Sequence, residues 1–132
     1  MILLDTHIWV WWVSGGRALT PSEFELLTAN EAAGIGVSIM SCWEVAKKVE
    51  QGKLELDRDV AAWISAAIVY PGVQLLDLTP AIVVESTRLP TPFHRDPADQ
   101  LIVATSRVLD IPLVTHDGKL RAYPHVEKVV LG

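Results

Sequence analysis

The stretch Ile2-Leu3-Leu4-Asp5-Thr6 opens the chain and decides the fold that we predict for it. Three apolar residues are too few for a helix, so this run predicts a short buried strand that ends at Asp5. A similar pattern comes late in the chain, where Pro112-Leu113-Val114-Thr115 is followed by His116-Asp117. In an open parallel α/β sheet, residues that follow the strands line the crevice at the carboxyl ends, where ligands bind. We therefore expect Asp5 and Asp117 to share one edge of a sheet.

Glu44 is a third candidate carboxylate, and it falls near the start of a predicted helix. It stands three residues after Ser41, the spacing of a capping box, and four residues before Lys48, the spacing of a favourable ion pair on a helix. Either structural role explains Glu44 without any chemistry. Its position at the same sheet edge as the two aspartates is what makes it a candidate for function.

Asp99 is the fourth candidate, and it competes with its neighbour Asp96. The pair Asp96-Pro97 predicts a helix N-cap followed by proline at the first helical position, which puts Asp99 in the first turn. On the helical wheel Asp99 lies roughly 60° from Ile102 on the buried stripe, whereas Asp96 points away from it. We expect Asp99 to face the sheet and Asp96 to face solvent.

The chain as a whole predicts one α/β domain over residues 1–132. Short apolar strands alternate with helical segments throughout, which is typical of a mainly parallel sheet flanked by helices. Residues 126–131 alternate weakly and predict a final edge strand.

The longest apolar run, residues 8–13, is far shorter than the roughly 20 residues that cross a membrane. With one cysteine and no recognisable leader segment, the expected location is the cytoplasm.

Three tryptophans follow the first strand closely. Trp9, Trp11 and Trp12 cover too wide an arc of a helix to lie on one buried stripe. They predict either a core helix with one exposed edge or a contact surface for another protein chain, since exposed aromatic residues concentrate at interfaces.

The net charge of −5 argues at first against a nucleic-acid partner. Its distribution changes that conclusion. Setting the four candidate carboxylates aside from the 16 acidic residues leaves 12, against 11 lysines and arginines. A cation bound by the four would therefore leave a nearly neutral molecule to meet an anion.

Four carboxylates at one sheet edge predict a metal site. Held close together, they repel one another and raise each other's pKa unless a cation is present. Hard oxygen ligands select Mg²⁺, with Mn²⁺ as a substitute, and no cysteine or histidine set has zinc spacing. Such an ion activates water and stabilises the charge of a phosphodiester. The basic residues that could hold the flanking phosphates of RNA are Lys47, His94, Arg95, His116 and Arg121.

The chain resembles the PIN-domain ribonucleases, specifically the VapC-type toxins. The resemblance rests on four motifs in order: LLDTH around Asp5, VSIMSCWEVA around Glu44, HRDPADQLIVAT around Asp99, and LVTHD ending at Asp117. It implies a parallel sheet in the order 3-2-1-4-5 and a Mg²⁺-dependent endoribonuclease that uses metal-activated water. It also implies a cognate antitoxin that occupies the acidic groove, and a homodimer.

Residue roles follow from the same resemblance. Asp5 and Asp99 match the principal metal ligands, while Glu44 and Asp117 match positions that hold a second ion or its water. Thr6 and Thr115 match neighbouring hydroxyl positions that orient these groups, and Asp96 stays open as an alternative or supporting ligand.

Other functions remain open at this point. His94 and His116 could act as acid and base in a metal-independent ribonuclease, which would resist EDTA and leave 2′,3′-cyclic phosphates. A PIN fold kept only for binding, without catalysis, is a second alternative. DNA rather than RNA as the substrate is a third, because the chemistry does not depend on the sugar.

Overall fold

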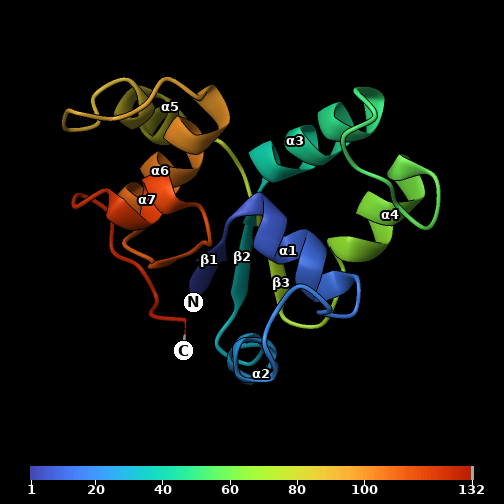
Figure 1. Ribbon diagram of the computed structural model, residues 1–132. Coiled ribbons are helices and arrows are strands. Elements are labelled where there is room, and N and C mark those ends of the chain that lie inside the picture. The colour runs from blue at the N-terminus through green and yellow to red at the C-terminus, as the bar shows by residue number, and fades with distance from the viewer. Residues whose placement is uncertain (132) are drawn as a thin grey trace.

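A four-stranded parallel sheet forms the centre of the molecule in the computed structural model, which describes residues 1–131 (Figure 1). Its strands, in the spatial order β3-β2-β1-β4, are β1 (Ile2–Leu4), β2 (Ile35–Ser38), β3 (Val73–Leu76) and β4 (Leu113–Val114). The helices are α1 (Thr6–Val13), α2 (Pro21–Ala29), α3 (Ile39–Glu50), α4 (Val60–Ala67), α5 (Pro80–Ser86), α6 (Pro97–Leu109) and α7 (Gly118–Ala122). The predicted α/β class is confirmed.

The central strand β1 pairs with β2 on one side and β4 on the other, both in parallel. Leu3 is in register with Gly36 of β2 and with Leu113 of β4. At position 36 a Cβ would lie 2.9 Å from a Leu76 side-chain carbon, so a larger residue there would require the Leu76 side chain to shift. Since all strands run the same way, every one of them ends at the same edge, which is where Asp5 follows β1.

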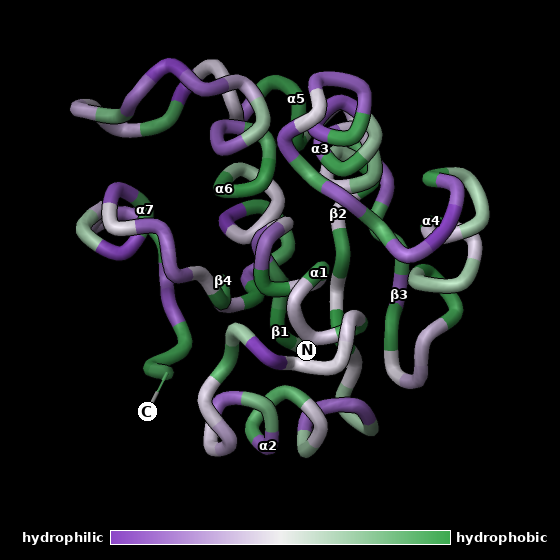
Figure 2. Tube along the Cα trace, turned by 45° about the vertical axis from the view of Figure 1, so that its right-hand side comes forward, coloured by the Kyte–Doolittle hydropathy of each residue, from purple (hydrophilic) through white to green (hydrophobic). Residues whose placement is uncertain are grey.

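The sheet is buried on both faces, as parallel sheets are. Ile2 and Leu4 pack with residues of α1 to α4, whereas Leu3 packs with residues of α6 and α7. Figure 2 shows β1, β2 and β3 as mostly apolar, while the helices around them alternate between apolar and polar segments. The alternation of side chains along β1 thus divides the core into two layers.

The tryptophans of α1 belong to the core. Trp9 and Trp12 are fully buried, and Trp9 packs edge-on against Trp63 with the ring centroids 5.1 Å apart. Trp11 is only partly buried and packs edge-on against His7. The prediction of a core helix with one exposed edge is confirmed.

The expected fifth strand is not formed as a strand. Within residues 126–131 only a single bridge joins Lys128 to Leu113, through hydrogen bonds of the Leu113 amide to Glu127 and of the Val129 amide to Leu113. The sheet order 3-2-1-4-5 is therefore corrected to 3-2-1-4. The physical reason is that β4 has only two residues and offers too short an edge for a longer ladder. No helix in residues 1–131 has the length and apolar character to cross a membrane.

Candidate active site at the carboxyl edge of the sheet

Asp5 is the buried centre of the site. It follows β1 directly and is 3% exposed. Its Oδ1 accepts the backbone N–H of Thr6 at 2.8 Å, and its Oδ2 accepts the hydroxyl of Thr115 at 2.7 Å. A carboxylate has about four lone-pair sites, so both oxygens can still bind a cation.

Thr115 links Asp5 to Asp117. The same hydroxyl that donates to Asp5 accepts the backbone N–H of Asp117 at 3.0 Å. Asp117 then caps α7, since its Oδ1 accepts the backbone N–H of Lys119 at 2.8 Å. The two aspartates that follow β1 and β4 thus share one hydroxyl, as expected from the parallel strands.

Glu44 reaches the site from within α3. The predicted capping box of Ser41 and Glu44 is wrong, because α3 begins two residues before Ser41 and is capped by Ser38, whose hydroxyl accepts the Met40 N–H. Instead, Glu44 accepts the hydroxyl of Thr6 at 2.5 Å, and Ser41 Oγ lies 2.8 Å from the same hydroxyl. Glu44 is therefore fixed to the start of α1 and not to its own helix terminus.

Asp99 and Asp96 have separate positions. Asp96 is exposed and caps α6, since its Oδ1 accepts the Asp99 N–H at 3.0 Å. The Asp99 side chain is 16% exposed, and its Oδ2 lies 2.6 Å from Nε2 of His94. The predicted orientations of the two aspartates are confirmed.

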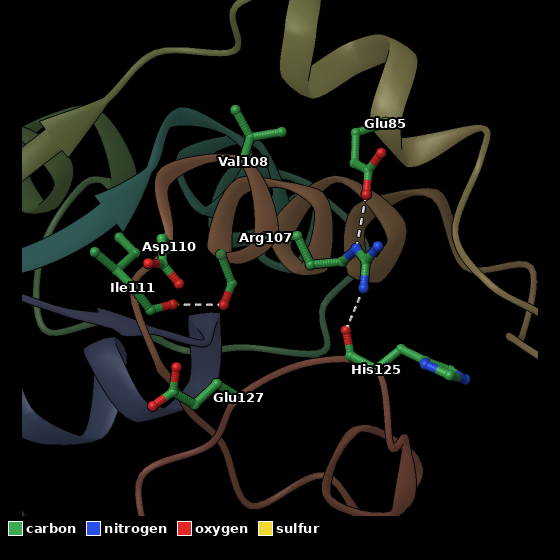
Figure 3. Close-up of a pocket in the computed structure, with 8 residues that line it drawn as sticks. Glu85, Arg107, Val108, Asp110, Ile111, His125 and Glu127 are labelled. Atoms are coloured by element: carbon green, nitrogen blue, oxygen red, sulfur yellow. Dashed lines mark hydrogen bonds and ion pairs between the residues drawn. The ribbon is translucent and has the colours of Figure 1, made fainter.

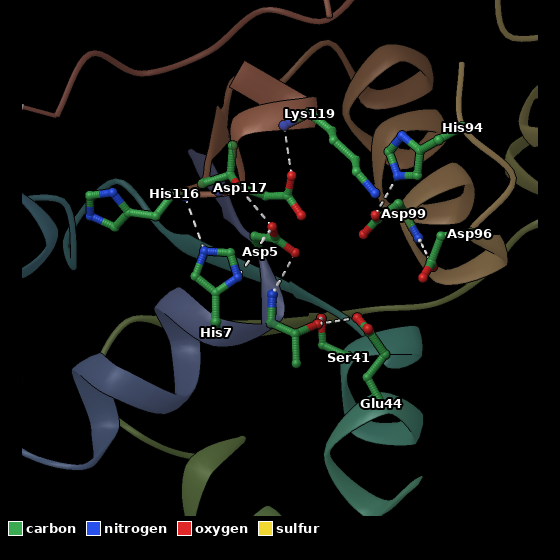
Figure 4. A network of polar contacts seen from close by, with 12 residues as sticks. Asp5, His7, Ser41, Glu44, His94, Asp96, Asp99, His116, Asp117 and Lys119 are labelled. Carbon is green, nitrogen blue, oxygen red and sulfur yellow. Dashed lines mark hydrogen bonds and ion pairs between the residues drawn. The ribbon is translucent and has the colours of Figure 1, made fainter. Parts of the chain in front are cut away.

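The carboxylates influence one another's ionisation. Burial raises the pKa of Glu44, and the charges of Asp5 and Asp99 raise it further, against the lowering effects of Thr6 and Lys48. Burial also raises the pKa of Asp99, with Asp96 and Asp5 adding to the effect and His94 opposing it. Figure 4 shows the side chains of Asp5, Glu44 and Asp99 around one region near the end of β1. The surroundings of Glu44 and Asp99 therefore disfavour the ionised forms of these two side chains.

The donor chemistry of this region fits a hard divalent cation. Its groups are carboxylate oxygens, and burial together with carboxylate repulsion raises the pKa of Glu44 and Asp99, a cost that a cation would reduce. No group of three or more His, Cys, Asp or Glu side chains within residues 1–131 is placed to hold a metal ion by itself. An ion bound here would need waters to complete its coordination, as Mg²⁺ commonly does.

His7 and Glu23 are parts of the site that the sequence did not predict. Nδ1 of His7 lies 3.5 Å from Oδ2 of Asp5, and its Nε2 accepts the backbone N–H of His116 at 3.0 Å. Burial lowers the pKa of His7 more than Asp5 raises it, which favours the neutral ring. The ring of His116 in turn lies 2.8 Å from Glu23. The contact of His7 with Asp5 is local, two residues apart, whereas the contacts of His116 with His7 and Glu23 join segments that are distant in sequence.

The predicted RNA-binding residues are distributed unevenly. The ring of His116 is paired with Glu23, that of His94 with Asp99, and the amine of Lys47 with Glu50 at 2.6 Å. Arg95 and Arg121 are exposed. Two further lysines adjoin the acidic residues: Lys48, four residues after Glu44 as the sequence indicates, and Lys53 line both a 240 Å³ hollow beside Glu44 and a 190 Å³ hollow beside His7.

The two histidines of the metal-independent alternative do not face each other. Each Nε2 is held by a different carboxylate, Glu23 for His116 and Asp99 for His94. Figure 4 places the two rings on opposite sides of Asp117. This geometry does not favour a joint acid and base.

A hollow of about 440 Å³, larger than the hollows beside Glu44 and His7, lies elsewhere (Figure 3). It is at the other end of α6 and contains none of the predicted site residues. Its arginine, Arg107, is held by Glu85 at 2.7 Å and by the carbonyl of His125 at 2.6 Å. Cavity size alone therefore does not locate the candidate site.

Comparison with known proteins agrees with this geometry. The chain belongs to the PIN-domain family, whose model matches residues 2–126. It is 30% identical to Ribonuclease VapC22 of Mycobacterium tuberculosis (strain ATCC 25618 / H37Rv), over 98% of this chain and 97% of that protein. The predicted resemblance to VapC-type proteins is confirmed.

Solved structures share the fold. VapBC2 from Rickettsia felis, bound to a DNA fragment from its promoter, superimposes with a TM-score of 0.72 at 17% identity, covering 98% of both chains. A toxin-antitoxin complex from Klebsiella pneumoniae superimposes with a TM-score of 0.66 at 18% identity, covering 100% of this chain and 98% of the other.

Proposed function

We propose that this protein is a Mg²⁺-dependent endoribonuclease that hydrolyses RNA phosphodiester bonds and is the toxin of a toxin-antitoxin pair. The observation that supports the proposal most strongly is the gathering of four acidic residues at one sheet edge. Asp5, Glu44 and Asp117 are connected through Thr6 and Thr115, and Asp99, held by His94, lies near enough to raise the pKa of Glu44. The identity to a ribonuclease supports RNA as the substrate.

Asp5 and Asp99 would hold the metal, with Glu44 and Asp117 holding a second ion or its waters. When bound, Mg²⁺ supplies a Lewis acid that lowers the pKa of water and neutralises phosphate charge. Asp96 is assigned to capping, because its side chain is exposed and already accepts the amide of Asp99.

The chain's own residues orient this chemistry. Thr115 fixes the relative positions of Asp5 and Asp117, and Thr6 fixes Glu44. A neutral His7 whose Nε2 accepts an N–H carries its proton on Nδ1, which lies 3.5 Å from Oδ2 of Asp5. Lys48 and Lys53 line the adjoining hollows and can hold the phosphates on either side of the cleaved bond.

An antitoxin is the proposed regulatory partner, because a structure that shares this fold is a toxin-antitoxin complex. A protein segment over the acidic edge would keep RNA from the carboxylates. Addition of the cognate antitoxin to a cleavage assay tests this, and undiminished cleavage would contradict it. The homodimer stays a prediction, for light scattering to check.

The test of the proposed activity is cleavage of a labelled structured RNA with Mg²⁺, with Mn²⁺ and with EDTA. We expect cleavage only with a divalent ion, leaving 5′-phosphate ends. Asp5→Asn and Asp99→Asn keep the side-chain size but remove a negative ligand, so cleavage should fall by 10²-fold or more, on the order of a lost metal or preorganised charge.

Asp57→Asn is the matched control, because Asp57 is exposed and pairs only with its neighbour Arg58 among the described residues. It should cleave like the unaltered protein. Full activity in a folded Asp5→Asn protein would refute the proposed site. Cleavage that resists EDTA and leaves cyclic phosphates would instead support the histidine mechanism.

A further inference from the structure

A small hollow lined by aromatic rings adjoins the carboxylates. It measures about 220 Å³ and lies between the loop before α6 and the C-terminal end of α7. Its walls include Phe93, His94, Lys119 and Tyr123, with Pro92 and Pro124 beside them. We refer to it as the aromatic hollow.

Two residues of the aromatic hollow are bonded directly to two of the proposed metal-holding carboxylates. The ring of His94 lies 2.6 Å from Asp99, and the backbone N–H of Lys119 donates to Asp117 at 2.8 Å. A single residue, His94 or Lys119, thus lies between the hollow and each of these two carboxylates. A phosphate held at the carboxylates would have its own nucleotide, or the next one, at the mouth of the hollow.

The lining is suited to a flat, uncharged ring. Phe93 stacks on His94 with centroids 4.5 Å apart and planes 23° from parallel, and it packs edge-on against Tyr123 at 4.7 Å. Rings arranged in this way can extend a stack to a further aromatic group. At about 220 Å³ the hollow is smaller than the roughly 300 to 1,000 Å³ of sites for drug-sized ligands, so it suits a single base.

The polar groups of the hollow favour stacking over recognition of base edges. The Tyr123 hydroxyl already donates to the carbonyl of Pro90 at 2.6 Å, and Nε2 of His94 is engaged by Asp99. Lys119 is exposed and supplies a positive charge beside the hollow. Stacking and charge together are how proteins hold single-stranded nucleic acid with little sequence preference.

We propose that the aromatic hollow binds one unpaired nucleobase of the RNA, next to the phosphate that is cleaved, by stacking it with Phe93 and His94. The inference rests on the proposed function, because it places this base relative to the nuclease centre. It further specifies the substrate as RNA with an unstacked nucleotide at the cleavage site.

The test compares the binding of two labelled single strands, a 12-nucleotide oligoadenylate and an abasic 12-mer with the same ribose-phosphate backbone. Anisotropy is measured with Ca²⁺ in place of Mg²⁺, and gels confirm that the RNA stays intact. The unaltered protein should prefer the strand with bases. Phe93→Leu, which keeps an apolar side chain but loses the ring, should bind oligoadenylate about 5- to 150-fold more weakly and the abasic strand unchanged.

Phe93→Tyr and Phe24→Leu are the controls. Phe93→Tyr keeps a ring and should retain the preference. Phe24→Leu removes a ring of similar burial from α2, where it packs in the opposite core layer, so it should change thermal stability without changing the preference for bases. A purely structural Phe93 would behave in the same way as Phe24.

Each result decides one of the two proposals. Two results would overturn the base-binding hollow even when cleavage is normal. One is that Phe93→Leu binds oligoadenylate as tightly as the unaltered protein. The other is that the unaltered protein shows no preference for the strand with bases. A ring-dependent preference without any metal-dependent cleavage supports the hollow and refutes the proposed nuclease.

Discussion

Thr115 and Thr6 connect three of the four acidic residues of the site. The Thr115 hydroxyl contacts both Asp5 and the backbone of Asp117, while Thr6 donates its amide to Asp5 and its hydroxyl to Glu44. Asp99 is held separately, by His94. These contacts fix the positions of the acidic side chains before any cation binds, which is a form of preorganisation.

Glu44→Gln should stabilise the metal-free protein at neutral pH. The folded pKa of Glu44 is raised above its unfolded value by burial and by Asp5 and Asp99. A raised carboxyl pKa gives a stabilising contribution that is complete below the unfolded pKa and is lost as pH rises through the folded pKa. Glutamine keeps an acceptor for Thr6 without the charge, so the free energy of unfolding of the variant should exceed that of the unaltered protein at pH 7.

The pH dependence of this difference is the check. Denaturant unfolding in EDTA should show the gap between Glu44→Gln and the unaltered protein closing as pH falls toward 4, because Glu44 is then protonated in both states. Saturating Mg²⁺ should reduce the gap at pH 7. A variant that is less stable than the unaltered protein at pH 7 in EDTA would show that burial and repulsion do not dominate at Glu44.

Single residues also show where sequence reasoning succeeds and fails. Asp99 was separated from Asp96 correctly, because helical periodicity and capping are local and both residues are in one turn. The capping role predicted for Ser41 and Glu44 belongs to Ser38, because serine is a favoured N-cap at either position and the sequence alone does not fix where α3 begins. Glu23 could not be found, because its contact with His116 depends on packing between distant segments, whereas His7 lies two residues from Asp5 and its proximity in sequence was the one available signal.

At the scale of elements, helix starts place the acidic groups. Asp5 precedes α1, Asp96 and Asp99 begin α6, and Asp117 caps α7. Carboxylates are favoured there by the free N–H groups and the helix dipole. The capping roles and the proposed metal-binding roles therefore coincide on the same short segments.

Asp96 allows the two roles to be separated. Asp96→Ala removes the cap of α6 and should lower the free energy of unfolding by about 1 kcal/mol, whereas Asp96→Ser keeps an N-cap acceptor and should cost only a small part of that. If Asp96 is only a cap, Asp96→Ser should cleave RNA nearly as well as the unaltered protein. Denaturant unfolding and cleavage rates of both variants are the measurements.

Loss of cleavage in Asp96→Ser as severe as in Asp99→Asn would instead identify Asp96 as a metal ligand. Comparing the two variants controls for helix stability, because both lack the charge of Asp96 and only the alanine variant also lacks a good N-cap.

Element types were more predictable than element ends. The run before Asp5 and the run before His116 are both buried strands, as their apolar character requires. The segment 126–131 was predicted as a strand because its apolar residues alternate, but strand formation depends on a partner edge, and β4 offers two residues. Strand pairing depends on two segments, so the sequence of one segment predicts it only weakly.

At the scale of the whole molecule, the parallel sheet explains why residues 5, 44, 99 and 117 meet. All strand ends lie at one edge, and α3 and α6 begin there. Solved structures at 17 and 18% identity share this fold, and the sequence match over residues 2–126 shows the PIN-domain family. The net charge of −5 is partly concentrated at this edge, so a bound cation is central to how the molecule would meet RNA.

The most direct test is a Mg²⁺ titration of the thermal unfolding of the unaltered protein, Asp5→Asn and the control Asp57→Asn at pH 7. A ligand that binds only the folded state stabilises it by RT ln(1 + [L]/Kd), or about 2.7 kcal/mol at a hundredfold excess over Kd. We predict a Tm that rises with Mg²⁺ for the unaltered protein and for Asp57→Asn, but not for Asp5→Asn. A Tm that does not respond to Mg²⁺ in the unaltered protein, or that rises equally in Asp5→Asn, would contradict a cation site built on these carboxylates.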